Sequence, residues 1–307
     1  MRRAGADVVE VGIAPVPRVR TFMLTDLVNA RAARRAAVRA LADHDPRAII
    51  YCSVTAALLW PRPGAIWLDS IAADNRPRRH GVWQRAVERR RLAEAPLVMA
   101  MSAGAAELVD SHAREVIVVP VPVETVDGPP PERDIAAITY ASGDAKKRRL
   151  ELVLDAWSRA RGEGEKLIVA GSDRLPPTVK IELLEGVELA GRLSPPDYQA
   201  LLRRSRAFVA APRREDYGIA PLEALAHGCM LVTTPASGPY PALSLARQLD
   251  PRLVSQHLDT ALRAALDDPV PGYAKRATEL LQPFTRQAVD HTVAEHVLPR
   301  LLDQRLP

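Results

Sequence analysis

Short runs of β-branched and other apolar residues alternate with longer segments of helical periodicity along the chain. In the first part, strands are predicted over residues 7–14, 48–53, 65–69, 97–101 and 116–121, and helices over 27–42 and 82–95. In the second part, strands are predicted over 135–141, 166–170, 186–190, 207–211 and 230–234, and helices over 150–161, 197–204 and 219–227. Strands separated by helices pair in parallel, because a parallel pair needs a long crossover connection. The sequence therefore predicts an α/β protein.

A proline-rich stretch separates the two sets of strands. Residues 128–134 contain three consecutive prolines and no periodicity, which is typical of a stiff linker, and 307 residues are enough for two domains. We expect a first domain over 1–127, the linker over 128–134, a second domain over 135–283 and a terminal helical segment over 284–307. Residues 1–5 have the pattern of a helix end that leads into a strand, so we expect the first domain to be shortened at its start.

Charge and cysteine content exclude several classes of protein. Lys and Arg number 42 and Asp and Glu 37, a mild surplus that suits an anionic small ligand or an acidic membrane surface better than nucleic acid. Cys52 and Cys229 lack metal-ligand spacing, which argues against a disulfide framework or structural zinc. Residues 48–61 form the longest charge-free apolar stretch, too short to span a bilayer, and Asp7 and Glu10 interrupt any signal peptide. We expect a cytoplasmic protein.

Two carboxylates flank a predicted strand-to-helix turn in the second part. Glu215 follows the strand over 207–211, and Glu223 lies eight positions later in the first turns of the next helix. Both side chains are expected to point toward the same opening at this turn. The backbone N–H groups of Tyr217, Gly218 and Ile219 would lie between them, as donors to hydroxyls or an anion. Each glutamate alone also has a structural explanation, as a helix-dipole partner or as a solvated ion pair.

A basic loop follows the first strand of the second part. Lys146, Lys147, Arg148 and Arg149 precede the predicted helix over 150–161, where positive charge opposes the helix dipole. Such a cluster costs stability unless an anion neutralises it, which favours a bound phosphate or diphosphate over a solvated loop.

The spacing of Glu215 and Glu223 resembles the Glu-x7-Glu signature of retaining glycosyltransferases with the GT-B fold, family 4. The resemblance extends through the segments 139–143, 167–171, 187–193 and 230–235. It implies two Rossmann-like domains that face each other across a cleft, with the first truncated here. It also implies that the C-terminal helix packs back on the first domain.

The same resemblance assigns roles to single residues. Glu215 would contact the transferred sugar near its anomeric centre, and Glu223 would accept hydrogen bonds from the ribose of the donor. The donor-binding set it implies is Gly143, Lys147, Arg148, Arg192, Leu193, Tyr217, Gly218, Ile219 and Glu223. Asp144 stands where the family has an Arg, and the loop between Gly143 and the helix is about one residue shorter than in the family. The main diphosphate ligand could therefore be either Lys147 or Arg148.

The first domain offers weaker candidates. Asp69 ends a predicted strand, at the edge where α/β sheets bind ligands, and is a candidate catalytic residue on the acceptor side. Arg85, Arg89 and Arg90 form a basic helix face that suits anionic lipid or, more simply, solvent. The Asp-x-Asp at residues 43–45 falls in a turn where Asp is common for structural reasons, so no metal site is expected.

The resulting expectation is a retaining, hexosyltransferase-type glycosyltransferase. It would move sugar from a nucleotide-diphosphate donor, used as co-substrate with no permanently bound cofactor and no required metal, to a glycan, lipid-linked or small-molecule acceptor. Peripheral contact with an anionic membrane is compatible with this predicted function, and a nucleic-acid partner is not expected. The alternative is a non-catalytic nucleotide-sugar-binding subunit or scaffold of a glycosyltransferase complex.

Overall fold

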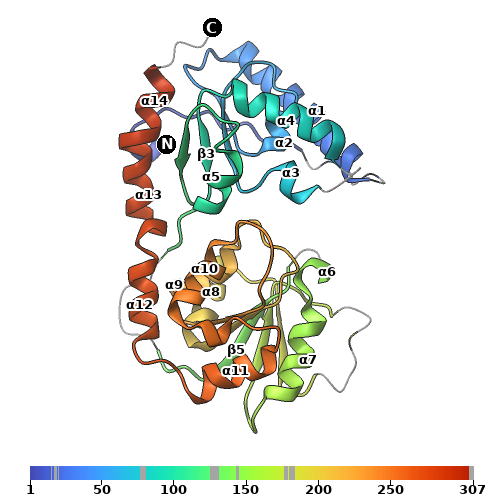
Figure 1. The fold of residues 1–307 in the computed structure, drawn as a ribbon, viewed down its shortest axis with the longest axis vertical. Coiled ribbons are helices and arrows are strands. Elements are labelled where there is room, and N and C mark those ends of the chain that lie inside the picture. Colours follow the sequence, from blue (N-terminus) through green and yellow to red (C-terminus); the bar gives the residue numbers. More distant parts are fainter. Residues whose placement is uncertain are drawn as a thin grey trace. The chain divides into compact units, whose positions relative to one another are not determined.

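The chain forms two compact units, each built around a parallel sheet (Figure 1). The computed structural model describes residues 1–14, 16, 19, 21–76, 81–124, 131–142, 145–175, 179 and 184–303. Unit 1 comprises Met1–Val121 with Arg286–Pro307, and unit 2 comprises Pro122–Thr285. None of the described helices is long and apolar enough to cross a membrane.

The sheet of unit 1 has four parallel strands in sequential order. They are β1 (Ile50–Tyr51), β2 (Ala65–Leu68), β3 (Val98–Ala100) and β4 (Val116–Val118). Helix α1 (Phe22–Asp43) precedes β1, and the connecting helices are α2 (Val54–Ala57), α3 (Ala72–Asn75), α4 (Val82–Glu94) and α5 (Ala103–Val109). The N-cap residues of α1, α2 and α5 are serine or threonine, and their side chains accept a hydrogen bond from a backbone N–H in the first turn of the helix. The local sequence therefore determines where these helices begin.

Alternating side chains of this sheet enter two separate cores. Ile66 and Leu68 pack with residues of the connecting helices on one face, and Leu97 and Met99 belong to the core on the other. The second core is completed by the chain's last segment, which runs through α13 (Arg286–Thr292), the π-helical turn η6 (Val293–Val297) and α14 (Leu298–Asp303). Its buried residues are Val289, Val293, Val297 and Leu301. The terminal segment is therefore part of the hydrophobic core of unit 1.

The strand predicted over residues 7–14 is wrong. The short 3-10 helix η1 (Arg2–Ala4) ends at Gly5 with φ 84°, and the chain then runs outside the sheet. Val9, Val11 and Ile13 are 55, 47 and 43% exposed. A strand needs a neighbouring strand and a buried face, and this segment has neither among the described residues.

Unit 2 has a five-stranded parallel sheet in the order β7-β6-β5-β8-β9. The strands are β5 (Ile135–Tyr140), β6 (Leu167–Ala170), β7 (Val187–Gly191), β8 (Ser205–Ala210) and β9 (Met230–Thr233). The strand order reverses between β5 and β8, and the crevice at such a switch point is where open α/β sheets bind ligands.

The helices of unit 2 include three that the sequence predicted, α7 (Leu150–Ala160), α8 (Pro195–Arg204) and α9 (Ile219–Ala226). The four-residue α6 (Ala145–Arg148) precedes α7, and α10 (Pro241–Leu249), α11 (Leu258–Asp267) and α12 (Tyr273–Leu280) follow β9. Trp157 of α7 and Phe208 of β8 are among the largest fully buried side chains.

Candidate functional site

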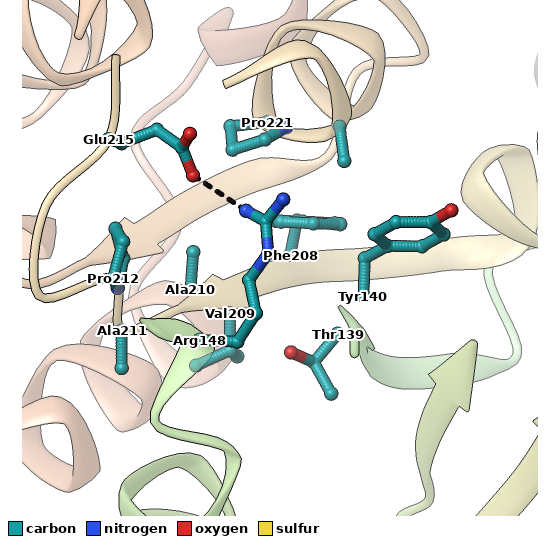
Figure 2. Close-up of a pocket in the computed structure, with 11 residues that line it drawn as sticks. Thr139, Tyr140, Arg148, Phe208, Val209, Ala210, Ala211, Pro212, Glu215 and Pro221 are labelled. Carbon is teal, nitrogen blue, oxygen red and sulfur yellow. Dashed lines mark hydrogen bonds and ion pairs between the residues drawn. The ribbon is translucent and has the colours of Figure 1, made fainter. Parts of the chain in front are cut away.

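A pocket opens at the switch point of unit 2, where β5 and β8 end and α9 begins (Figure 2). The lining residues are Thr139, Tyr140, Arg148, Phe208, Val209, Ala210, Ala211, Pro212, Glu215, Ala220 and Pro221. Its volume of about 20 Å³ is room for about one water molecule. One carboxylate and one guanidinium thus face each other at the edge of the sheet where a ligand is expected.

Glu215 is held by a loop whose conformation depends on two glycines. The backbone N–H of Glu215 donates to the Ser237 carbonyl at 3.0 Å, and Glu215 as a whole is only 5% exposed. A Cβ on Gly238, which has φ 99°, would lie 2.4 Å from the carbonyl oxygen of Glu215. A Cβ on Gly218, which has φ 80°, would lie 2.6 Å from the ring of Tyr240. Only glycine fits these two positions, which fix the backbone of Glu215.

The carboxylate of Glu215 is shared by two cations. Arg148 Nη1 donates to Oε2 at 2.6 Å, drawn as the dashed line in Figure 2, and Lys147 Nζ lies 3.8 Å from Oε1. Lys147 also lies 3.8 Å from a carboxylate oxygen of Asp216. Glu215 and Asp216 thus supply negative charge next to Lys147 and Arg148, and the phosphate or diphosphate expected at this basic loop stays a prediction.

Arg149 links the basic loop to the loop after β8. Its guanidinium donates to the carbonyls of Ala211 and Pro212, at 2.7 and 3.1 Å, and to Thr234 Oγ1 at 2.9 Å. The backbone N–H of Arg213 donates to the Lys147 carbonyl at 3.1 Å. These bonds hold the two loops together and so bring Arg148 to Glu215. Gly143 and Asp144 lie outside the described residues, as does the side chain of Lys146.

Glu223 lies on α9, half-buried, and burial raises the pKa of its carboxyl above the ordinary value. Tyr198 of α8 is close enough for the charge of Glu223 to raise the pKa of the Tyr198 phenol, although burial is the larger cause. The Tyr198 hydroxyl is buried with no hydrogen-bond partner among the described residues, and the Tyr198 ring packs on Tyr140, with centroids 5.4 Å apart. Tyr198 lies in the predicted helix over 197–204, but neither its position nor its spacing indicated a place beside Glu223.

The other predicted donor-binding residues divide into two groups. Tyr217 is buried, Gly218 is the N-cap of α9, and Ile219 is 45% exposed at the first position of that helix. Arg192 and Leu193 follow β7, an edge strand separated from β8 by two strands. Among the described residues, neither these two nor Tyr217, Gly218, Ile219 and Glu223 line the pocket that contains Glu215.

The candidates of the first domain lie in unit 1. Asp69 is exposed directly after β2, at the carboxyl end of that strand. On α4, Arg85 donates to the Arg76 carbonyl at 2.6 Å and Arg90 pairs with Glu94 at 2.6 Å, so two arginines of the predicted basic face make contacts within the protein.

The predicted Asp-x-Asp lies beside the end of α1, and its second aspartate, Asp45, lies 3.5 Å from Arg62. No group of His, Cys, Asp and Glu suited to a metal ion occurs in the described part of the chain.

Comparison with known proteins gives one family match and many structural matches. Residues 136–269 match the family model described as Glycosyl transferases group 1. No curated protein sequence matches the chain. The solved structure of WaaG, described as a glycosyltransferase involved in lipopolysaccharide biosynthesis, is 14% identical with a TM-score of 0.66, over 93% of this chain and 85% of that one.

Two further structures contain uridine nucleotides. One from E. coli, described as trehalose-6-phosphate bound with UDP-2-fluoro glucose, is 12% identical with a TM-score of 0.65, over 90% of this chain and 78% of that one. The pneumococcal O-GlcNAc transferase GtfA, in complex with UDP and GlcNAc, is 11% identical with a TM-score of 0.60, over 81% of this chain. This chain covers 54% of the length of GtfA. The chain thus has the GT-B fold of parallel α/β sheets in two Rossmann-like domains, and residues 136–269 of the second are similar to a glycosyltransferase family.

Proposed function

We propose that this chain is a retaining glycosyltransferase of the hexosyltransferase type, which transfers a sugar from a nucleoside-diphosphate donor to a sugar or lipid-linked acceptor. One observation carries the proposal. Two cations, Arg148 and Lys147, meet the carboxylate of Glu215 at the switch point of unit 2, inside the segment that matches a glycosyltransferase family. The group that binds phosphate and the group that meets the sugar would thus be neighbours.

The two cations would stabilise the leaving group. When the bond between the anomeric carbon and the diphosphate breaks, negative charge grows on the departing phosphate oxygens. Fixed positive charge close to those oxygens lowers the barrier, because it stabilises the transition state more than the ground state. Arg148 and Lys147 can supply this charge without a metal ion, so we expect transfer to continue in the presence of EDTA.

The two glutamates would act at opposite ends of the donor. Glu215 would face the sugar and stabilise the positive charge that develops at its anomeric centre, and Glu223 would accept hydrogen bonds from the ribose. The backbone N–H groups of Gly218 and Ile219, at the start of α9, would donate to hydroxyls or phosphate oxygens. Unit 1 would hold the acceptor, with Asp69 as the candidate group for its proton.

A donor screen tests the proposal. Purified chain is incubated with UDP, GDP, ADP and TDP sugars and a panel of acceptors, water included, and product configuration is followed by NMR. We expect one donor class to react with retention of configuration. Glu215→Gln should lower turnover about 100-fold or more while donor binding persists, as expected for a group that acts in the transition state. Nucleotide binding without transfer to any acceptor would instead favour the non-catalytic subunit.

A further inference from the structure

The carboxylate of Glu215 already lies where a donor phosphate would be expected. Its Oε2 accepts a 2.6 Å bond from Arg148, its Oε1 lies 3.8 Å from Lys147, and its side chain is 7% exposed. The two cations are more open, with side chains 30 and 41% exposed. A single buried carboxylate therefore contacts two partly accessible cations and offsets one of their two positive charges.

The pocket at this ion pair is small. Arg148 and Glu215 both line a cavity of about 20 Å³, which holds about one water molecule. Figure 2 shows the guanidinium of Arg148 pointing across this cavity to the carboxylate. A diphosphate that takes the place of the carboxylate at Arg148 opens the Arg148–Glu215 bond.

The backbone of Glu215 is fixed, and its side chain lies against a glycine. The N–H of Glu215 is bonded to the Ser237 carbonyl, and Gly218 presents no side chain beside the Glu215 Cγ: a Cβ on Gly218 would lie 3.1 Å from that atom. A diphosphate carries more negative charge and more acceptor oxygens than one carboxylate, so it competes well for the two cations.

We propose that Glu215 is an internal stand-in for the donor diphosphate, a role that rests on the proposed function. The diphosphate displaces the carboxylate from Arg148 and Lys147, and the released carboxylate turns to the sugar ring. Glu215 then takes up its position at the reacting sugar only when a diphosphate is bound. The cost of opening the ion pair is subtracted from donor affinity, so the carboxylate that serves the reaction weakens nucleotide binding.

Calorimetric titration with UDP, GDP, ADP and TDP tests this inference on the full chain. Glu215→Gln keeps the shape of the side chain and removes its charge, and the tightest of the four nucleotides should bind about tenfold more tightly to it than to the unmodified chain. Glu215→Ala should also bind more tightly, which provides a second variant if the first does not fold. The matching nucleoside, which has no phosphate, should bind all three proteins equally.

Asp216→Asn is the matched control. It removes one negative charge at the next residue, 3.8 Å from Lys147, but leaves the Arg148–Glu215 bond in place. If the bond to Arg148 is the main obstacle to the diphosphate, Asp216→Asn should increase nucleotide affinity by less than about threefold. A gain equal to that of Glu215→Gln, or Glu215 variants that bind the nucleotide no more tightly than the unmodified chain, would overturn the inference alone. Failure of every nucleotide to bind any of these proteins would overturn the proposed function as well.

Discussion

At the scale of single residues, Arg149 has an unusual backbone conformation. Among the described residues it is the one with a positive φ, 49°, that is not glycine. A left-handed conformation costs about 1–2 kcal/mol for a residue with a Cβ, and three hydrogen bonds from the guanidinium offset that cost. The side chain therefore has a structural role, to hold the loops that carry Arg148 and Glu215.

Arg149 can be tested with a pair of substitutions. Arg149→Ala and Arg149→Gly both lose the three bonds, but only glycine relieves the strain of the left-handed backbone. We expect both to destabilise unit 2, with Arg149→Gly about 1 kcal/mol less harmful. Urea denaturation followed at Trp157, the one tryptophan between residues 122 and 285, measures this. Equal stability of the two variants would argue against backbone strain.

At the same scale, the site was only partly predictable. Glu215 and Glu223 stand out by their spacing, because a turn between strand and helix brings such a pair to one edge of the sheet. The bond between Arg148 and Glu215 joins residues 67 positions apart. It depends on how two loops approach each other, which no local pattern encodes.

At the scale of elements, the strands of unit 2 and helices α1, α4, α7, α8 and α9 were predicted, whereas helices α10, α11 and α12, of nine, ten and eight residues, were not. The five strands of unit 2 were each predicted within two residues. Four of them are mostly buried apolar runs, as is typical of parallel strands, whereas the edge strand β7 is partly exposed. Helices α2 and α3 have four residues each, too few to show a helical period. Residues 7–14 have the composition of a strand but pair with no strand of either described sheet. Whether a segment forms a strand depends on the neighbours it packs against and not on its own composition alone.

Helix α3 depends on a buried carboxylate from α4. Both oxygens of Glu88 accept from the N–H of Ala72, at 2.9 and 2.8 Å. Burial raises the pKa of Glu88 to about 7, despite the opposing effect of these bonds and of Arg76. Asp26 lies near enough to contribute to the increase, and it is bonded to Arg76 at 3.3 Å. The folded chain therefore keeps a proton at Glu88 that the unfolded chain loses at lower pH.

This proton predicts a pH dependence with a definite sign. Between pH 4.5 and 7 the folded state binds more protons at Glu88 than the unfolded state, so the free energy of unfolding falls as pH rises. The loss attributable to Glu88 is about 3 kcal/mol. Glu88→Gln should lack this pH-dependent loss of stability. In urea denaturation, the free energy of unfolding of the variant should therefore rise relative to that of the unmodified chain from pH 4.5 to 8. Parallel pH profiles would show that Glu88 titrates alike in both states.

At the scale of the whole molecule, the chain's two ends belong to one unit. The terminal segment from α13 to α14 buries Val297 completely and Leu301 almost completely against the sheet of unit 1. Unit 1 thus folds from residues at both ends of the sequence, with unit 2 inserted between them. A defect in the last turns should therefore weaken unit 1 and leave unit 2 stable.

Val297→Ala tests this arrangement. Loss of two buried methyl groups should lower the stability of unit 1 by about 2 kcal/mol. Leu302→Ala, at a side chain that is 39% exposed, is the control and should cost less than about 0.5 kcal/mol. Fluorescence of Trp60, Trp67 and Trp83 in unit 1, compared with that of Trp157 in unit 2, separates the two transitions in single-tryptophan variants. A shift confined to Trp157 would contradict the assignment.

The proposed activity requires a nucleoside diphosphate to bind at the switch point of unit 2. The most direct measurement is a calorimetric titration of UDP, GDP, ADP and TDP into the purified chain and into Arg148→Ala. We expect at least one nucleotide to bind the unmodified chain with one site per chain, and Arg148→Ala to bind it at least tenfold more weakly. Equal affinities of the two proteins, or no binding of any of the four nucleotides to the unmodified chain, would contradict the account.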